Sequence, residues 1–186
     1  MSFGPGDKLY YHVVFNITTN GSGSSTATIA FTMANSATQG RAANAELDTP
    51  GYNALVASNI QITNAGVNLM RNGNSGAANP LIKYVALGTS STTPTANDTT
   101  LGAEAFRKQV VSYTNGSTGE ILVTGYFSST DAVGINVAEI GIFGGNTASS
   151  AANSGILVAH GLYALGHAKT GLEAVQAVLN LSYTHL

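Results

Sequence analysis

The fold is decided by the stretch Ile82–Phe143, which opens on Ile82-Lys83-Tyr84-Val85-Ala86-Leu87-Gly88. A Ser/Thr-rich loop follows this apolar run, and the segment Leu101–Lys108 then brings in acidic and basic side chains. The stretch closes on Glu139-Ile140-Gly141-Ile142-Phe143. Short apolar runs bounded by glycine and polar loops are typical of β-strands. The stretch therefore predicts consecutive strands.

Two-residue alternation of apolar and polar side chains extends the strand pattern on both sides. Before the stretch, Leu9–Ile17 and Thr26–Met33 alternate and are separated by the turn-forming segment Asn20–Ser25, which predicts a β-hairpin. After it, Gly155–Tyr163 and Ala174–Thr184 alternate in the same way. In the predicted strand Gly155–Tyr163, the alternation puts four residues on one face: Ile156, Val158, His160 and Leu162.

One short helix is predicted between the hairpin and the central stretch. Thr63 has the side chain of an N-cap, and a helix over Ala65–Asn72 follows it. Val67 and Met70 are three residues apart and would face inward, with Gly73 in the left-handed position that ends the helix.

The expected fold class is mainly β, an antiparallel β-sandwich or a jelly-roll-like domain with one short helix on its edge. Strands follow one another without the helical segments that a parallel sheet requires. We expect residues 1–60 to form an N-terminal β-hairpin extension with an arm over Asn35–Asn53, used in assembly. Residues 61–186 would form the sandwich core.

The composition departs from that of typical soluble domains mainly in charge. Charged residues make up 9% of the chain, whereas roughly 25% is usual. Hydrophobic residues make up 44%, which is enough for a substantial core. A surface of Ser, Thr, Asn, Gly and Ala with a net charge of −2 has little electrostatic repulsion, so it favours association with copies of itself.

Several classes of function are disfavoured by the same composition. The few Lys and Arg residues are not clustered, so we expect no nucleic-acid partner. No run approaches the roughly 20 apolar residues that span a bilayer, and the N-terminal residues lack the pattern of a signal peptide. Cysteine is absent, which removes disulfides and thiolate chemistry.

A set of short motifs runs through the last two thirds of the chain. The motifs are Tyr84-Val85-Ala86-Leu87-Gly88-Thr89, Thr93-Pro94-Thr95, Asp98, Leu101, Glu104, Arg107, Glu139-Ile140-Gly141-Ile142-Phe143 and Leu157-Val158-Ala159-His160-Gly161. In this order and spacing they resemble a recurrent pattern in the small structural domains of bacteriophage tail-fibre, tail-collar and baseplate-associated proteins. The resemblance covers about residues 63–186. His160 stands where an arginine is common in these domains, and residues 1–60 fit no part of the pattern.

The resemblance implies a non-enzymatic, self-assembling subunit of a phage particle, located in the virion and assembled in the host cytoplasm. Its partners would be copies of itself and neighbouring virion proteins. One alternative is a capsid decoration (cement) protein. Another, of a different class, is a carbohydrate-binding module for host attachment, in which exposed tyrosines would contact a host-surface glycan. No cofactor is implied.

Three residues are candidates for structural ion pairs: Glu104, Arg107 and Glu139. On a helical turn, Glu104 and Arg107 would face each other at i, i+3 and form a local surface bridge. The alternative is that Arg107 reaches Glu139 or Asp98 across the fold and pins the loop after Gly88.

Catalytic and metal sites are not expected. Glu139 as an acid or base of a glycosidase would need a second carboxyl at roughly 5–9 Å, and no spacing forces one there. The candidates for that second carboxyl are Glu104, Glu120 and Asp131. No histidine pair has the spacing of a zinc helix, so half-buried, hydrogen-bonded side chains are expected for His12, His160 and His167, while His185 is simply near the end of the sequence.

Overall fold

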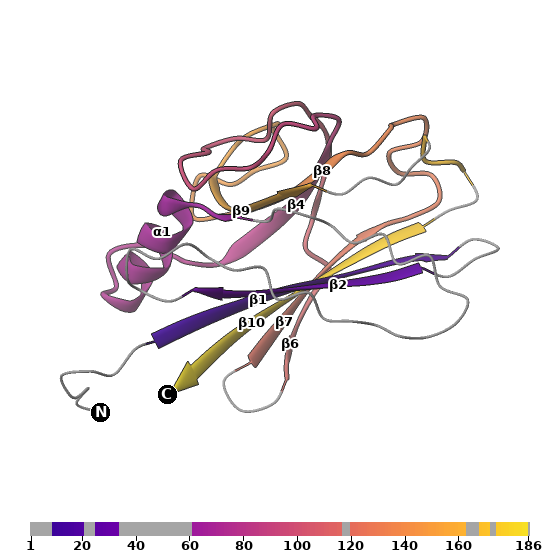
Figure 1. Ribbon diagram of the computed structural model, residues 1–186. Helices are drawn as coiled ribbons and strands as arrows, with labels where there is room; N and C mark the ends of the chain where they lie inside the picture. Colours follow the sequence, from indigo (N-terminus) through magenta and orange to yellow (C-terminus); the bar gives the residue numbers. More distant parts are fainter. Residues whose placement is uncertain are drawn as a thin grey trace.

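Two five-stranded antiparallel sheets form the computed structural model, which describes residues 9–20, 25–33, 61–116, 120–162, 168–171 and 174–185 (Figure 1). The elements in chain order are β1 (Leu9–Asn20), β2 (Ser25–Met33), β3 (Gln61–Ile62), α1 (Asn64–Asn74), β4 (Ile82–Gly88), β5 (Glu104–Gln109), β6 (Ser112–Asn115), β7 (Glu120–Phe127), β8 (Glu139–Gly144), β9 (Ile156–Leu162) and β10 (Ala174–His185).

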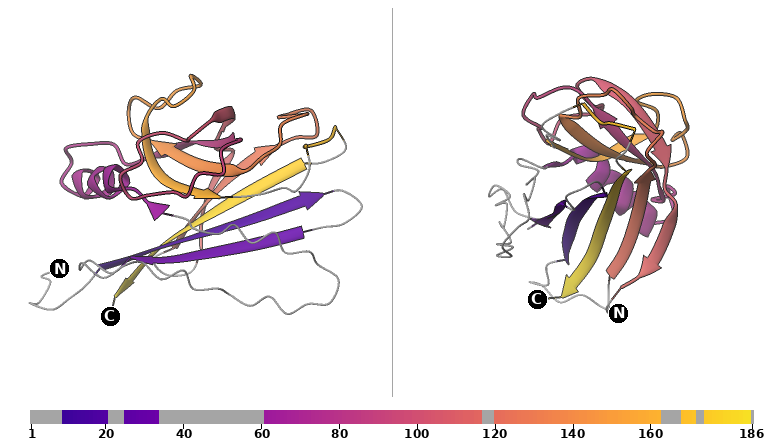
Figure 2. Two further views of the ribbon diagram at one scale, coloured as in Figure 1. Left: turned by 45° about the horizontal axis from the view of Figure 1, so that its top comes forward. Right: turned by 90° about the vertical axis from the view of Figure 1, so that its right-hand side faces the viewer.

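The sheets are stacked as two layers (Figure 2). The lower sheet of Figure 1 has the strand order β2-β1-β10-β7-β6, and the upper sheet has the order β3-β9-β8-β4-β5. The pairings within both sheets are antiparallel. The predicted class, a mainly β fold of antiparallel sheets with one short helix, is confirmed.

The main core lies between the sheets. Phe127 of β7 is fully buried and meets the partly buried Phe106 of β5 edge-to-face, with ring centroids 6.0 Å apart. Such aromatic pairs add about 0.5–1.5 kcal/mol to the gain from burial alone. The buried members of this core are Ile82, Val85, Leu87, Val110, Val123, Phe127, Ala132, Val137, Ile140, Ile142, Ala159, Val175, Ala177 and Leu179.

The chain passes from one sheet to the other at Val110 and Val111. The N–H of Val110 donates to the Lys83 carbonyl of β4 at 2.9 Å, whereas the N–H of Val111 donates to the Thr124 carbonyl of β7 at 2.8 Å. Two consecutive residues thus bond to different sheets. This crossing holds the β5–β6 side of the sandwich together.

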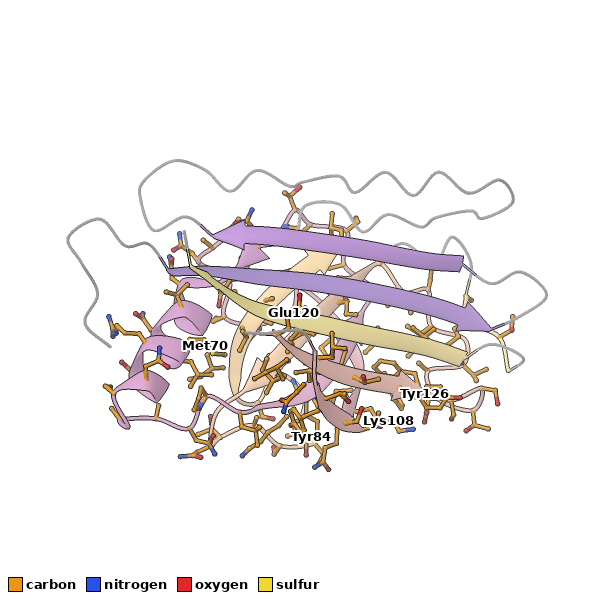
Figure 3. The ribbon with its side chains drawn as sticks, turned by 90° about the horizontal axis from the view of Figure 1, so that it is seen from below. Met70, Tyr84, Lys108, Glu120 and Tyr126 are labelled. Carbon is orange, nitrogen blue, oxygen red and sulfur yellow. The ribbon has the colours of Figure 1, made fainter. Side chains whose placement is uncertain are left out.

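Helix α1 begins at the predicted N-cap, but the residues that it buries differ from those that the sequence pattern predicted. Thr63 accepts a hydrogen bond from the Gly66 N–H at 2.9 Å, as expected of an N-cap. The buried residues of the helix are Gly66 and Leu69, while Val67 is only half-buried and Met70 lies partly buried toward the strands (Figure 3).

The predicted end of the helix was wrong. Gly73 lies inside α1, and the left-handed backbone belongs to Gly76, with φ 73°. Ser75 ends the helix, and its N–H donates back to the Arg71 carbonyl at 3.2 Å.

A second, smaller core lies on the outer face of the upper sheet. It contains Ala86, Leu101, Phe143 and Leu157, with Tyr84 packed against them. The loops between β4 and β5 and between β8 and β9 lie over this face, at the top of Figure 1. Because both faces of β8 are covered, all six of its residues are buried, including the charged Glu139.

The N-terminal hairpin extends the lower sheet. β1 pairs with β10 from Leu9↔His185 to Asn20↔Ala174, and β2 pairs with the other edge of β1. That residues 1–60 act as an assembly extension stays a prediction, and the arm over Asn35–Asn53 lies outside the described residues. Within the described part of the chain, no helix has the length and apolarity to cross a membrane.

The close approach of α1 to β9 generates a first prediction. A Cβ added at Gly66 would lie 2.5 Å from the Val158 carbonyl oxygen, a backbone atom that cannot move aside alone. Alanine usually stabilises a helix by roughly 0.5–1 kcal/mol relative to glycine. Here we expect Gly66→Ala to lower the free energy of unfolding by about 1–3 kcal/mol because of the clash.

Urea unfolding of the whole chain measures this change. The matched control is Gly171→Ala, where an added Cβ would meet nothing within 4 Å. Equal unfolding midpoints for Gly66→Ala and the unchanged protein would contradict the packing described here.

Candidate functional site

A buried carboxylate, that of Glu139, lies at the start of β8 in the upper sheet, beside the last residues of β4 and β9. The whole of Glu139 is 0% exposed. Oε1 accepts hydrogen bonds from the N–H groups of Ala103 (2.7 Å) and Ser90 (3.2 Å). Oε2 accepts from the Gly102 N–H at 2.9 Å and lies 2.9 Å from Nε2 of His160. Glu139 therefore ties both ends of the β4–β5 loop to β8.

His160 extends from β9 beside this carboxylate and lies between two acidic groups. It is 3% exposed, and its register partner on β8 is Gly141. While Nε2 contacts Glu139, Nδ1 lies 2.8 Å from Oδ2 of Asp98. A neutral imidazole has one N–H, so hydrogen bonds to two carboxylates require the doubly protonated ring.

Asp98 ends a short turn that also contacts the helix. Its carboxylate accepts from the Thr95 N–H at 2.9 Å and from the Thr95 hydroxyl at 2.6 Å. Asn64, the first residue of α1, donates its N–H to the Ala96 carbonyl at 2.7 Å and its side-chain amide to Asn97 at 2.9 Å. The cluster of Asp98, His160 and Glu139, here called the acid–histidine cluster, thus joins a loop, two strands and a helix.

The three groups in this cluster shift one another's pKa values in the direction that keeps all three charged. Burial alone would raise the pKa of Glu139, but hydrogen bonds from His160 and from three backbone N–H groups hold it below its ordinary 4.5. Burial alone would lower the pKa of His160, but the hydrogen bonds to Glu139 and Asp98 raise it above 6.5. The pKa of Asp98 is lowered in spite of burial by its bonds to Thr95 and His160.

A second buried ion pair, Glu104–Arg107, lies on the same face. Oε1 of Glu104 is 2.5 Å from Nε of Arg107, and Oε2 is 2.7 Å from Nη2, so the contact is bidentate. The side chains of Arg107 and Glu104 are only 4% and 2% exposed. The guanidinium carbon lies 4.3 Å from the centre of the Phe143 ring, within the range of a cation–π interaction.

A β-bulge brings this pair together. In a regular strand, residues three apart point to opposite faces. Arg107 pairs with Ala86, and Phe106 pairs with Leu87, but Gly88 pairs with Glu104, so the register skips Ala105. The extra residue returns Glu104 to the face of Arg107.

The Glu104–Arg107 pair holds the loop between β8 and β9. Nη1 of Arg107 donates to the carbonyls of Ser149 and Ser154, each at 3.0 Å. Oε2 of Glu104 accepts from the Asn153 N–H at 2.8 Å. Asn153 also accepts from the Leu101 N–H at 3.2 Å through its side chain, which links the two loops.

Two of the predictions for these residues were wrong. Glu104 and Arg107 do form an ion pair, but on a strand and buried, not as a surface bridge on a helical turn. Arg107 makes no ion pair with Glu139 or Asp98; its partners are Glu104 and the loop that contains Ser149 and Ser154. The loop after Gly88 is pinned by Glu139 together with His160, a pairing that the sequence did not reveal.

Gly88 is required where the two sites meet. It is the register partner of Glu104 on β5 and of Glu139 on β8. A Cβ at Gly88 would lie 2.3 Å from Oε1 of Glu139. The glycine of the Ala-Leu-Gly-Thr motif therefore makes room for the carboxylate of the Glu-Ile-Gly-Ile-Phe motif.

The other candidate acids and histidines do not gather around Glu139. Glu120 is on β7 of the opposite sheet, and Asp131 forms an ion pair with Lys108. Among the residues that the structure describes, no group of three or more His, Asp or Glu side chains has the arrangement of a metal site. The side chains of His12 and His185, and the whole of His167, lie outside the described part.

Comparison with protein families, with curated proteins and with solved structures finds no match for this chain. The functional argument therefore depends on the motifs of the sequence and on the geometry of these two clusters.

The burial of Glu139 generates a second prediction. Glu139→Gln keeps the shape of the side chain but removes its charge. In the unchanged protein, backbone N–H groups donate to both carboxylate oxygens, so the N–H₂ group of the glutamine would face a donor instead of an acceptor. We expect a loss of about 3–5 kcal/mol in the free energy of unfolding, the usual result of breaking a buried ion pair. Urea unfolding measures it, with Asp131→Asn as the control, because that carboxylate is 17% exposed and water can replace part of its contacts. Equal losses in the two variants would refute the role given to Glu139.

A third prediction compares neighbouring cations on β5. Arg107→Lys keeps the charge but loses the bidentate contact, so we expect a loss of about 2–3 kcal/mol. Lys108→Gln breaks a pair whose lysine side chain is 38% exposed, so we expect about 1 kcal/mol or less. Thermal and urea unfolding of both variants test the difference, and the reverse order would contradict it.

Proposed function

We propose that this chain is a non-enzymatic structural subunit of a bacteriophage particle that assembles in multiple copies in the tail, fibre, collar or baseplate region. The observation that carries the proposal is the convergence of the phage-like motifs on one piece of structure. Tyr84–Thr89, Glu104, Arg107 and Glu139–Phe143 lie on the adjacent strands β5, β4 and β8 or directly follow them.

The charged residues of these motifs support a structural role because they are used inside the fold. Glu104, Arg107 and Glu139 have buried side chains, and each binds the backbone of a surface loop. Groups that act on a substrate must be reached by it. Here the carboxylates instead accept hydrogen bonds from the protein itself.

The remaining surface supports association through uncharged contacts. Charged residues are 9% of the chain, and burial of Glu104, Arg107, Glu139 and Lys169 removes further charge from the surface. β6 is an end strand of its sheet, and its four residues, Ser112-Tyr113-Thr114-Asn115, are exposed and uncharged. Uncharged sheet edges lack the lysines with which soluble proteins prevent edge-to-edge pairing, and strand addition is a common mode of assembly.

The alternative of a carbohydrate-binding module receives less support from the described residues. It calls for neighbouring exposed aromatic rings. Tyr113 and Tyr126 are 47% and 40% exposed, but Tyr113 is the register partner of the core residue Val123, whereas Tyr126 alternates away from it. The two tyrosines are thus on opposite faces of their sheet.

Assembly behaviour provides a fourth prediction. We expect the purified chain to form a defined oligomer or polymer by sedimentation velocity. Because few ion pairs are available to the contact, the association should change little between about 0.05 M and about 1 M salt. A stable monomer at high concentration, together with absence of the chain from purified particles, would refute the proposal.

Antibody labelling of intact particles distinguishes the positions within the virion. Label on the tail, fibre, collar or baseplate supports the proposal. Label on the head would instead favour the decoration-protein alternative. Binding of isolated host polysaccharide by a monomeric chain would favour the carbohydrate-binding module.

A further inference from the structure

Two turns in the molecule have the same local construction. In the first, Asp98 accepts hydrogen bonds from the N–H and hydroxyl of Thr95, and its own N–H donates to the Thr95 carbonyl at 3.2 Å. In the second, Asp131 accepts from the N–H (2.6 Å) and hydroxyl (2.7 Å) of Ser128, and its N–H donates to the Ser128 carbonyl at 3.1 Å. Each is a hydroxyl residue followed three positions later by aspartate.

The two turns differ in the cation that the aspartate meets. Asp131 contacts the ammonium of Lys108, and Asp98 contacts the ring of His160. An aliphatic ammonium keeps its proton through the pH range in which an imidazole loses one. The two turns should therefore respond differently to pH.

We propose that the contact between Asp98 and His160 is a pH-sensitive latch, which holds the turn 95–98 against β9 and beside the first residue of α1, and which opens when His160 loses one proton. With both nitrogens protonated, His160 donates to Asp98 and to Glu139 at once. After one proton leaves to water, the ring can donate to only one carboxylate. Its other nitrogen then presents a lone pair to the remaining carboxylate.

The environment of the two carboxylates decides which contact opens. Glu139 is fully buried, so losing the His160 donor would leave its charge without water to replace it. The Asp98 side chain is 25% exposed and can be hydrated when it separates. The remaining proton therefore stays on Nε2, facing Glu139, and the proton that leaves is the one on Nδ1.

Within the part of the chain that the structure describes, the elements packed around His160 carry no other charged group that could replace Asp98 or Glu139 as its partner. On β9 itself His160 is the only ionisable residue, and its register partners are Gln61 on β3 and Gly141 on β8. Helix α1 carries only Arg71, whose guanidinium donates to Asn72. Glu104, across Gly88 from Glu139, is paired with Arg107.

The sign of the effect follows from the raised pKa of His160. Of the two carboxylates that raise the pKa of His160, Glu139 stays bonded in the open state and only Asp98 separates, so the latched state binds the imidazole proton more tightly than the open state. The latch is therefore fully effective below the pKa that His160 has in the open state, and it is lost as the pH rises through the pKa of the latched state. Between these two values the opening constant should rise about tenfold per pH unit. Opening would release the Ala96 and Asn97 contacts of Asn64 and change the surface beside α1.

Backbone hydrogen exchange of the full chain from about pH 5.5 to about pH 9.5 tests the latch, with rates corrected for intrinsic base catalysis. The reporter amides are those of Asn64, Thr95 and Asp98, and the matched control amides are those of Ser128 and Asp131. We expect protection of the reporters to fall by tenfold or more across the titration of His160, while the control amides change little. Equal pH dependence in the two turns would overturn the proposal.

The histidine itself provides the second measurement. Nitrogen chemical shifts of the His160 ring should show loss of the proton at Nδ1 with Nε2–H retained. Asp98→Asn should lower the midpoint of this titration by about one pH unit or more because it removes an opposite charge, and Asp131→Asn should leave it unchanged. Deprotonation at Nε2, or an equal shift in both variants, would contradict the latch. This inference does not depend on the proposed virion role.

Discussion

The burial of one carboxylate beneath a surface loop is the constraint on which the upper half of this molecule depends. Glu139 occupies a strand that is covered on both faces, so its charge must be balanced by the protein. Three backbone N–H groups at the two ends of the β4–β5 loop and the ring of His160 supply that balance. Because each donor must be held in place, the loop, β9 and the turn at Asp98 adopt one arrangement together.

The Glu104–Arg107 ion pair likewise holds a surface loop with buried charged groups. Glu104 and Arg107 bind the loop between β8 and β9 through its backbone, and Asn153 links that loop to Leu101. A chain with 9% charged residues thus uses two of its buried charged clusters to order two adjoining surface loops. Buried ion pairs contribute little net stability but strongly disfavour arrangements that separate them.

Most of the strand pattern could be predicted because it depends on local periodicity. The hairpin of Leu9–Asn20 and Ser25–Met33, the strand at Ile82–Gly88 and the cap at Thr63 agree with the structure. The alternation assumed for β9 was wrong in detail. Its register skips Val158, so Leu157 and His160 both pair with the residues of β8 that share the face of Glu139. A bulge is set by the partner strand, and no pattern within one strand reveals it.

The amino-acid sequence by itself determined the class of fold, the order of the strands along the chain and the scarcity of surface charge. These follow from side-chain period and composition, which are properties of neighbouring residues. Only the tertiary structure decided that Arg107 binds Glu104 within a strand, and that Glu139 takes His160 and Asp98 as partners. The physical reason is distance along the chain. Glu139 and His160 are separated by a whole loop, and they meet because β8 and β9 pair in one register, which is set by the packing of the whole sheet.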